Sequence, residues 1–432
     1  MSIHSVDPAS SLNGIITLAP DKSIAQRAAI FSLLHDGPST IYNYSQAQDP
    51  QTTLHCVEYL GAMVEVEKEN DKLIITGVGR DGISAQTDEL DCGNSGTAMR
   101  LLSGVLTGAG ISVKLIGDPS LSGRTMTRII NPLEEMGAHI LARNGAFAPL
   151  FISREDPLKA LKFTLPIPSA QLKSCILLAG LFGEEETCVI EPIPSRDHTE
   201  RLLQLNVETD DQGLRRIYAS KAHDIPSQNY RIPGDYSAAA FWLVAGSIVP
   251  NSVITLPDVG LNPTRIASLH ILKEMGAQVD ILEDESEFTE PVAKLTVRTA
   301  ELSGIEIPPE WIPNTIDELP ILAVAMAFAD GDSHIRGAAE LRHKETDRIM
   351  AITKLLDAIG ASYKEYDDGL SIHGNPSLTF NAAHFESFHD HRIAMASAVA
   401  ALRGNKSSSI KDAEAAAVSY PEFWDHLDHL RG

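Results

Sequence analysis

The chain has 432 residues, of which 43% are hydrophobic and 22% are charged, and its formal net charge at pH 7 is -23. A chain of this length and composition is expected to fold into two or more globular domains, each with its own core. The negative charge and the lack of any Lys/Arg-rich run argue against a nucleic-acid partner.

The cysteines and the N-terminus favour a cytoplasmic location. None of the four cysteines forms a CxxC pair: Cys56, Cys92, Cys175 and Cys188. Since an HExxH pattern is also missing, a motif-type zinc site and a disulfide scaffold are not expected. The N-terminus lacks the pattern of a signal peptide, and the longest apolar stretch, Ala238 to Val249, is too short to cross a bilayer. We therefore expect no membrane partner.

Seven expected helix starts have charged or hydroxyl side chains where the first backbone N–H groups lack intrahelical partners. In chain order they are Lys22-Ser23 with Arg27, Asn94-Ser95 with Arg100, Arg124 to Arg128, Ser169-Ala170-Gln171, Asp317, Lys344 to Arg348, and Asp390 to Arg392. Ser23 is the expected cap of the first helix, and Gly96 would let a ligand approach the second closely. Each start alone is also typical of an ordinary capped helix, but the repetition favours a site for several anions.

An internal repeat is visible in the helix ends. An apolar residue followed by Gly-Ala closes a helical pattern four times, at Gly61, Gly137, Gly276 and Gly360. The middle interval is about twice the other two, as if one copy near Leu205 had lost its signature. A unit of about 70 residues suits a βαβ-type element with extra strands, used about six times.

Two proline-containing segments indicate the domain borders. Pro20 follows a strand-like segment, and 233–237 precedes the helical residues 238–243. If both are crossovers, residues 1–20 and 237–432 form one discontinuous domain. Residues 21–236 then form an inserted domain, and each domain holds three repeat units.

The chain resembles the EPSP synthases (3-phosphoshikimate 1-carboxyvinyltransferases) of the enolpyruvyl transferase family, essentially from end to end. The motifs that support the resemblance are Asp21-Lys22-Ser23-Ile24 with Arg27, Gly93 to Arg100, Ser169-Ala170-Gln171, Arg196 to Glu200, Asp235-Tyr236-Ser237, Ile316-Asp317-Glu318, Lys344 to Arg348, and Asp390-His391-Arg392. The resemblance implies an α/β fold, namely a two-domain inside-out α/β barrel. It would contain about six βαβαββ-type units, three per domain, with the active site in the interdomain cleft.

The resemblance also implies a reaction. The enolpyruvyl group of phosphoenolpyruvate is transferred to the 5-hydroxyl of shikimate 3-phosphate, which gives EPSP and phosphate through a tetrahedral intermediate. This step belongs to chorismate and aromatic amino acid biosynthesis. Both substrates have a phosphate and a carboxylate, so the site needs clustered Arg and Lys, and its local field is positive although the protein is acidic. No cofactor and no metal are expected.

The site residues follow from the matching motifs. Shikimate 3-phosphate would be bound by Lys22, Ser23, Arg27, Ser169, Ala170, Gln171, Arg196, Asp317 and Lys344. Phosphoenolpyruvate would be bound by Lys22, Asn94, Gly96, Arg124, Gln171, Arg348 and Arg392. Asp317 is the expected base for the hydroxyl proton, whereas Glu345 and Lys22 are candidates for proton transfer at the methylene carbon. The division of these proton-transfer roles stays open.

The chain departs from the family pattern at several positions. Ala19-Pro20 stands where relatives commonly have Pro-Gly, Gln26 replaces the usual His or Asn, and no Lys lies near Val418 to Pro421. Position 96 is Gly, whereas relatives that are insensitive to glyphosate often have Ala there. We therefore expect glyphosate to inhibit the enzyme.

Three other functions remain as alternatives. UDP-N-acetylglucosamine enolpyruvyl transferases share the fold but commonly place a reactive Cys on a mobile loop, and the corresponding Gly117 to Arg124 has none. A nonenzymatic anion-binding protein of the same fold would be indicated by loss of Asp317, Glu345 or Lys22. A nucleotide phosphotransferase would need a GxxxxGK[ST] or GxGxxG motif, and neither occurs. We expect a monomer.

Overall fold

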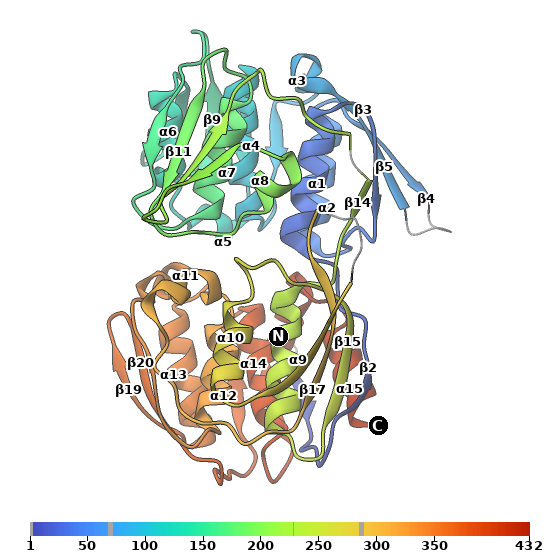
Figure 1. The fold of residues 1–432 in the computed structure, drawn as a ribbon, viewed down its shortest axis with the longest axis vertical. Coiled ribbons are helices and arrows are strands. Elements are labelled where there is room, and N and C mark those ends of the chain that lie inside the picture. Colours follow the sequence, from blue (N-terminus) through green and yellow to red (C-terminus); the bar gives the residue numbers. More distant parts are fainter. Residues whose placement is uncertain (1–2, 68–71, 228, 285–288) are drawn as a thin grey trace. The chain divides into compact units, whose positions relative to one another are not determined.

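The computed structural model describes residues 3–67, 72–227, 229–284 and 289–432, which form two compact units (Figure 1). Unit 1 comprises Met1–Ala19, Pro233–Glu287 and Pro291–Gly432. Unit 2 comprises Pro20–Ile232 and Phe288–Glu290. Each unit has three sheets.

Unit 2 contains the sheets β14-β3-β5-β4, β6-β7-β9-β8 and β10-β11-β13-β12. Their strands are β3 (Asp36–Tyr42), β4 (Met63–Glu67), β5 (Lys72–Val78), β6 (Glu89–Asp91), β7 (Val113–Ile116), β8 (His139–Arg143), β9 (Phe147–Ser153), β10 (Lys162–Thr164), β11 (Thr187–Glu191), β12 (Val207–Thr209), β13 (Arg215–Ala219) and β14 (Asn229–Arg231). The helices are α1 (Lys22–Leu34), α2 (Gln48–Tyr59), α3 (Gly79–Gly82), α4 (Gly96–Ala109), α5 (Pro119–Ser122), α6 (Thr127–Glu135), α7 (Ala170–Gly180) and α8 (His198–Leu203).

Unit 1 contains the sheets β16-β17-β15-β2, β18-β20-β19 and β1-β22-β21. Its strands are β1 (Ile3–Val6), β2 (Asn13–Ile15), β15 (Val253–Gly260), β16 (Gln278–Glu283), β17 (Val292–Arg298), β18 (Gly331–Ile335), β19 (Ser362–Tyr366), β20 (Gly369–Gly374), β21 (His384–Glu386) and β22 (Ser408–Lys411). Its α-helices are α9 (Tyr236–Ile248), α10 (Ala267–Glu274), α11 (Ile312–Thr315), α12 (Leu319–Ala327), α13 (Arg348–Ile359), α14 (His391–Ala401) and α15 (Phe423–Arg431). Within the described residues of unit 1, the short 3₁₀ helices are η2 (Pro309–Trp311), η3 (Ala339–His343) and η4 (Ala413–Val418).

The same strand pattern recurs in the sheets of both units. A parallel pair opens five of the described sheets: β14 with β3, β6 with β7, β10 with β11, β2 with β15, and β21 with β22. In the sheet of β18, isolated parallel bridges Ser303–Asp330 and Glu306–His334 stand in that place. Antiparallel strands continue each sheet, as in β7-β9-β8 and β11-β13-β12. The predicted repeat of α/β units is therefore confirmed.

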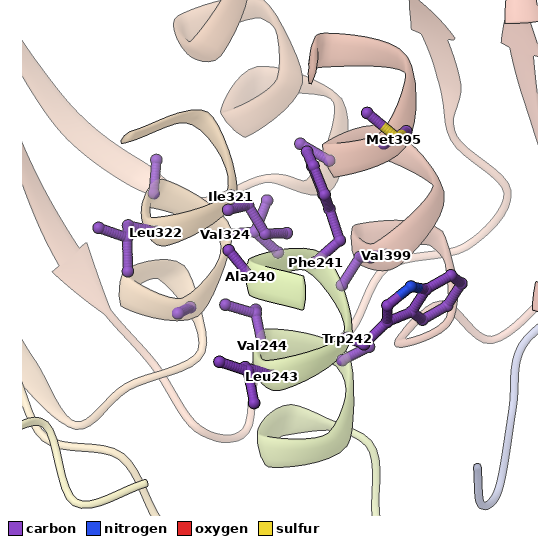
Figure 2. Packing of buried hydrophobic residues seen from close by; sticks show 14 of the residues in the cluster. Ala240, Phe241, Trp242, Leu243, Val244, Ile321, Leu322, Val324, Met395 and Val399 are labelled. Atoms are coloured by element: carbon purple, nitrogen blue, oxygen red, sulfur yellow. The ribbon is translucent and has the colours of Figure 1, made fainter. Parts of the chain in front are cut away.

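One long helix in each repeat is buried, and we call these six the inner helices: α1, α4 and α7 in unit 2, and α9, α12 and α14 in unit 1. Every residue of α9, α12 and α14 is buried, because apolar and small side chains surround these helices. Figure 2 shows Phe241 of α9 beside Val324 of α12 and Val399 of α14, while Trp242 points away from Val324. The Trp242 ring stacks on the ring of Phe423.

Glycines allow two features of this packing. A Cβ at Gly104 would lie 2.2 Å from the carbonyl oxygen of Cys175, so only glycine lets α4 and α7 approach this closely. The four predicted Gly-Ala helix ends have positive φ at the glycine, as a helix end in the left-handed region requires. At the missing fifth end, after α8, Gln204 adopts the left-handed conformation instead.

Among the described residues, no helix is both long and apolar enough to span a membrane.

Candidate functional site

The predicted site residues lie at or beside helix N-termini in both units. In unit 2, Lys22 and Ser23 begin α1, and Asn94 and Gly96 lie at the start of α4. The start of α7 contains Ser169, Ala170 and Gln171. Arg124 lies between α5 and α6, and Arg196 precedes α8. In unit 1, Asp317 precedes α12, Lys344 and Glu345 lie between η3 and α13, Arg348 begins α13, and Arg392 is the second residue of α14.

Side-chain caps define the inner helix starts of unit 2. Asp21, not Ser23 as predicted, accepts the hydrogen bond from the third helical N–H of α1 at 2.9 Å. The Ser23 hydroxyl cannot serve as the cap because Lys22 and Ser23 already have helical backbone. Ser95 caps α4 at 3.0 Å and Ser169 caps α7 at 3.4 Å. Each cap occupies one N–H group at a helix N-terminus, where the helix dipole favours an anion.

Three other helices begin where the sequence predicted a start. Within 344–348, α13 begins at Arg348 and is capped by the Asp347 carboxylate. Within 124–128, α6 begins at Thr127, and α12 begins at Leu319 with Pro320 in its first turn. The polar residues in front of these helices therefore lie in loops.

Two cations of α1 are held by neighbouring elements of unit 2. Lys22 Nζ lies 3.1 Å from Asp49 Oδ2. The buried Arg27 donates from Nε to Thr199 Oγ1 at 2.9 Å and from Nη2 to Ser174 Oγ at 3.2 Å. These two hydroxyl oxygens fix the Arg27 guanidinium beside α7 and α8.

The starts of α4 and α7 are joined through side chains. Arg100 Nη1 donates to Gln171 Oε1 at 2.7 Å, and Gln171 Nε2 donates to Thr97 Oγ1 at 2.9 Å. A Cβ at Gly96 would lie 2.6 Å from Arg100 Nη1 and 3.5 Å from Arg124 Nη1. Gly96 therefore lies between two guanidinium groups, an arrangement suited to a small, strongly charged anion.

Amide side chains complete this group. Asn94 Oδ1 accepts from Arg124 Nη2 at 2.8 Å, while Asn94 Nδ2 donates to Asp118 Oδ2 at 2.7 Å. Gln26 Nε2 donates to Ser95 Oγ at 2.6 Å and so links α1 to the start of α4. The predicted residues Asn94, Gly96, Arg124 and Gln171 are thus brought together with Arg100.

Arg348 organises the predicted residues of unit 1. Its Nη1 lies 3.2 Å from Asp317 Oδ1, its Nη2 lies 2.7 Å from Glu345 Oε2, and its Nε lies 2.8 Å from Asp390 Oδ2. Lys344 Nζ also lies 3.4 Å from Asp317 Oδ1. Burial lowers the pKa of Arg348, but the Asp390, Glu345 and Asp317 carboxylates outweigh burial and raise it. The guanidinium therefore stays charged and holds two candidate acid–base groups.

Arg392 belongs to a second buried network of unit 1. Its Nη1 lies 3.5 Å from Glu318 Oε1, which also accepts a 2.5 Å hydrogen bond from Ser237 Oγ. Arg265 Nη2 donates to Ser237 Oγ at 2.7 Å and to Asp235 Oδ1 at 3.0 Å. This network joins the starts of α9, α12 and α14.

Sequence reasoning left several of these residues out of the predicted site, among them Gln26, Arg100 and Glu318. Arg100 was recognisable as a cation one turn into α4, but its contact with Gln171 depends on the packing of α4 against α7. Glu318 follows the predicted base directly, and nothing in its local pattern indicates Arg392 as its partner. Among the described residues, no group of three or more His, Cys, Asp or Glu side chains is arranged to hold a metal ion.

A family model for EPSP synthase (3-phosphoshikimate 1-carboxyvinyltransferase) matches residues 6–427. The chain belongs to the EPSP synthase family. A curated relative from Salinibacter ruber, named 3-phosphoshikimate 1-carboxyvinyltransferase, is 48% identical over 99% of both chains. A relative of the same name from Desulfitobacterium hafniense is 45% identical over 98% of this chain and 97% of its own.

Solved structures show the same relationship. The EPSP synthase of Acinetobacter baumannii has a TM-score of 0.87 at 36% identity, covering 99% of this chain and 98% of its own. The enolpyruvyl transferase NikO of Streptomyces tendae has a TM-score of 0.77 at 15% identity, covering 99% and 97%, and shares the fold. The predicted family and the predicted inside-out α/β fold class are confirmed.

Proposed function

We infer that this chain is a 3-phosphoshikimate 1-carboxyvinyltransferase of the shikimate pathway, which transfers the enolpyruvyl group of phosphoenolpyruvate to shikimate 3-phosphate. Family membership over residues 6–427 is the main support. Locally, the function is supported by the three carboxylates around the buried Arg348, because two of them, Asp317 and Glu345, are the candidate acid–base groups.

We assign the unit 2 residues mainly to substrate binding. Arg27, Ser169, Ala170 and Arg196 would bind shikimate 3-phosphate through cationic side chains and the start of α7. Asn94, Gly96, Arg124 and Gln171 would bind phosphoenolpyruvate, as would Lys22, Arg348 and Arg392. These assignments are supported by the Arg100 and Arg124 guanidinium groups close to Gly96 and by the hydroxyl groups that hold Arg27 in place.

We assign the chemistry to the Arg348 cluster. Asp317 would take the proton of the substrate 5-hydroxyl, and Lys22 or Glu345 would handle the proton at the methylene carbon. The reaction then proceeds by addition and elimination, and phosphate leaves. Fixed cations such as Arg348 would stabilise the charge that develops, without reorganisation during the reaction.

The direct test is phosphate release from phosphoenolpyruvate, with and without shikimate 3-phosphate, and with UDP-N-acetylglucosamine in a parallel sample. Release that requires shikimate 3-phosphate is expected. Release with the sugar nucleotide would instead assign to the chain the reaction of the UDP-N-acetylglucosamine enolpyruvyl transferases. A folded protein that releases no phosphate with either acceptor would favour the anion-binding alternative.

We further propose that residues 1–20 with 237–432 and residues 21–236 form two domains, and that the enzyme is a cytoplasmic monomer. Shikimate 3-phosphate should slow amide hydrogen exchange in both Lys22–Leu34 and 317–329, because both segments contain proposed binding residues. Protection of only one segment would contradict the assignment of binding residues to both domains. Light scattering would measure the mass in solution.

Glyphosate should inhibit the enzyme in competition with phosphoenolpyruvate, because position 96 is glycine. A methyl group there would lie 2.6 Å from Arg100 Nη1, so Gly96→Ala must displace this guanidinium and should weaken inhibition. The measurement is a glyphosate dose series at low phosphoenolpyruvate. Full activity of the unaltered protein at high glyphosate would refute the prediction.

A further inference from the structure

A cluster of four charged side chains lies beneath the start of α7 in unit 2, three of them buried and the fourth, Arg215, partly buried. Lys173 Nζ lies 3.0 Å from Glu191 Oε1 and 2.7 Å from Glu200 Oε1, and the Lys173 and Glu191 side chains have no exposed surface. Arg215 Nη1 lies 3.2 Å from Glu191 Oε2, and Arg215 Nη2 lies 3.5 Å from Glu200 Oε1. Two positive and two negative charges make the cluster neutral overall.

The cluster holds the backbone of Ser195, the residue before Arg196. The Ser195 N–H donates to Glu191 Oε1 at 2.8 Å, and the Ser195 hydroxyl donates to the same oxygen at 2.5 Å. The Ser195 carbonyl oxygen accepts from Lys173 Nζ at 3.3 Å. The backbone N–H, backbone C=O and side chain of Ser195 are therefore all bound to charged groups.

The same turn of α7 also supports Arg27. Ser174, next to Lys173, shares a 2.6 Å hydrogen bond with Thr199 and accepts from Arg27 Nη2. The first turn of α7 presents Ser169, Ala170 and Gln171, and the following residues 173–174 hold the elements that provide Arg27 and Arg196. One helix thus links three groups of the proposed shikimate 3-phosphate site.

Stability alone gives a poor account of the cluster. Desolvation of buried ions is costly, and well-packed apolar side chains often replace a buried ion pair without loss of stability. A network of fixed charges does, however, hold a neighbouring group in one orientation. We propose that Lys173 is a positioning residue for the phosphate of shikimate 3-phosphate, acting through Glu191 and Ser195 on Arg196. The proposal rests on the proposed function, which assigns Arg196 to this phosphate.

The test is equilibrium binding of shikimate 3-phosphate by calorimetry, without phosphoenolpyruvate, combined with a double-mutant cycle. Lys173→Met should weaken binding about 10- to 100-fold, the range expected when one hydrogen bond between a charged group and the phosphate is lost. In an Arg196→Ala background the same substitution should have almost no further effect, because the residue through which Lys173 acts is gone. A purely structural role would give equal losses in both backgrounds.

Two variants keep the result interpretable. The double variant Lys173→Met/Glu200→Gln restores a neutral cluster, so it should fold even if the single variant does not. It still lacks the ammonium group that holds the Ser195 carbonyl, and it should therefore still bind shikimate 3-phosphate weakly. Lys114→Met is the matched control, since Lys114 is an exposed lysine of unit 2 paired with Glu89, and it should bind normally. Thermal unfolding would verify that each variant is folded.

The outcomes separate the two proposals. If the unaltered protein binds no shikimate 3-phosphate, the proposed function fails. If it binds and the folded Lys173 variants bind within twofold of it, or if the cycle is additive, the positioning role is refuted and the proposed function stands.

Discussion

The predicted site residues of the two units are held in different ways. In unit 2, neutral side chains link several cations to neighbouring elements: Arg27 donates to two hydroxyls and Arg124 donates to the Asn94 amide. Lys22 of the same unit pairs with Asp49. In unit 1, Arg348 contacts three carboxylates and holds them around one guanidinium. This contrast underlies our proposal that unit 2 provides most of the anion binding and unit 1 most of the proton transfer.

The largest effect is expected at Asp317. Asp317→Asn removes the proposed base but keeps its shape beside Arg348. Phosphate release at saturating substrates should fall about 10²- to 10⁴-fold, the usual range for general acid–base groups. The matched control is Asp332→Asn, on β18, whose side chain is 61% exposed. Normal turnover by the Asp317→Asn protein would contradict the assignment of proton transfer to unit 1.

The next largest effect is expected at Glu318, which faces Arg392 in unit 1. Glu318→Gln preserves a hydrogen-bond acceptor for Ser237 but removes the buried charge opposite Arg392. Because Arg392 would lose the charged partner that orients it, the KM for phosphoenolpyruvate should rise about tenfold, comparable to the loss of one hydrogen bond to a charged group. The KM for shikimate 3-phosphate should change little. Steady-state kinetics with each substrate varied in turn would measure both. Glu310→Gln, at an exposed residue, is the control, and equal changes in both KM values would argue against the assignment of Arg392.

A smaller effect is expected at Arg342, which fastens the loop of Lys344 and Glu345. Arg342 Nη1 donates to Asp347 Oδ2 and its Nη2 to Glu365 Oε1, each at 2.9 Å. Hydrogen bonds with Glu365 and Asp347 raise its pKa, so the charge persists across the working range of pH.

Lysine cannot span these partners with one ammonium group. Arg342→Lys should lower the turnover rate about three- to tenfold, less than the roughly 10²-fold cost of a full 1 Å misplacement. Arg336→Lys, at an exposed arginine paired with Asp368, is the control and should retain the rate. An unchanged rate in the Arg342 variant would show that the loop holds its position without this contact.

The smallest effect is expected from thiol alkylation. A hydrogen bond with Cys56 and burial raise the pKa of Cys92, and burial raises that of Cys175. A raised pKa keeps a thiol protonated until more alkaline pH, so little reactive thiolate exists at pH 7.5. Iodoacetamide should leave the rate of phosphate release unchanged. Loss of activity in proportion to the labelling of Cys92 would instead indicate a reactive cysteine.

Much of the site was predictable because helix starts are local features. A residue such as Ser95 or Ser169 caps a helix through its own backbone neighbours, so a short motif is enough to find it. The same reasoning was wrong for Ser23, because the neighbouring Asp21 caps α1 instead. Local patterns therefore locate a helix start more reliably than they assign its cap.

The amino-acid sequence by itself determined the family, the α/β class, the repeated units and the motif positions of the candidate site, since these depend on periodicity, glycines and short patterns. Which charged side chains pair with each other depends on the tertiary structure. Arg348 contacts Asp390, and Lys173 contacts Glu191 and Glu200, across separate elements. Packing of the inner helices creates these contacts, and the energy of a buried charge depends on its neighbours in space. No local pattern in the chain specifies those neighbours.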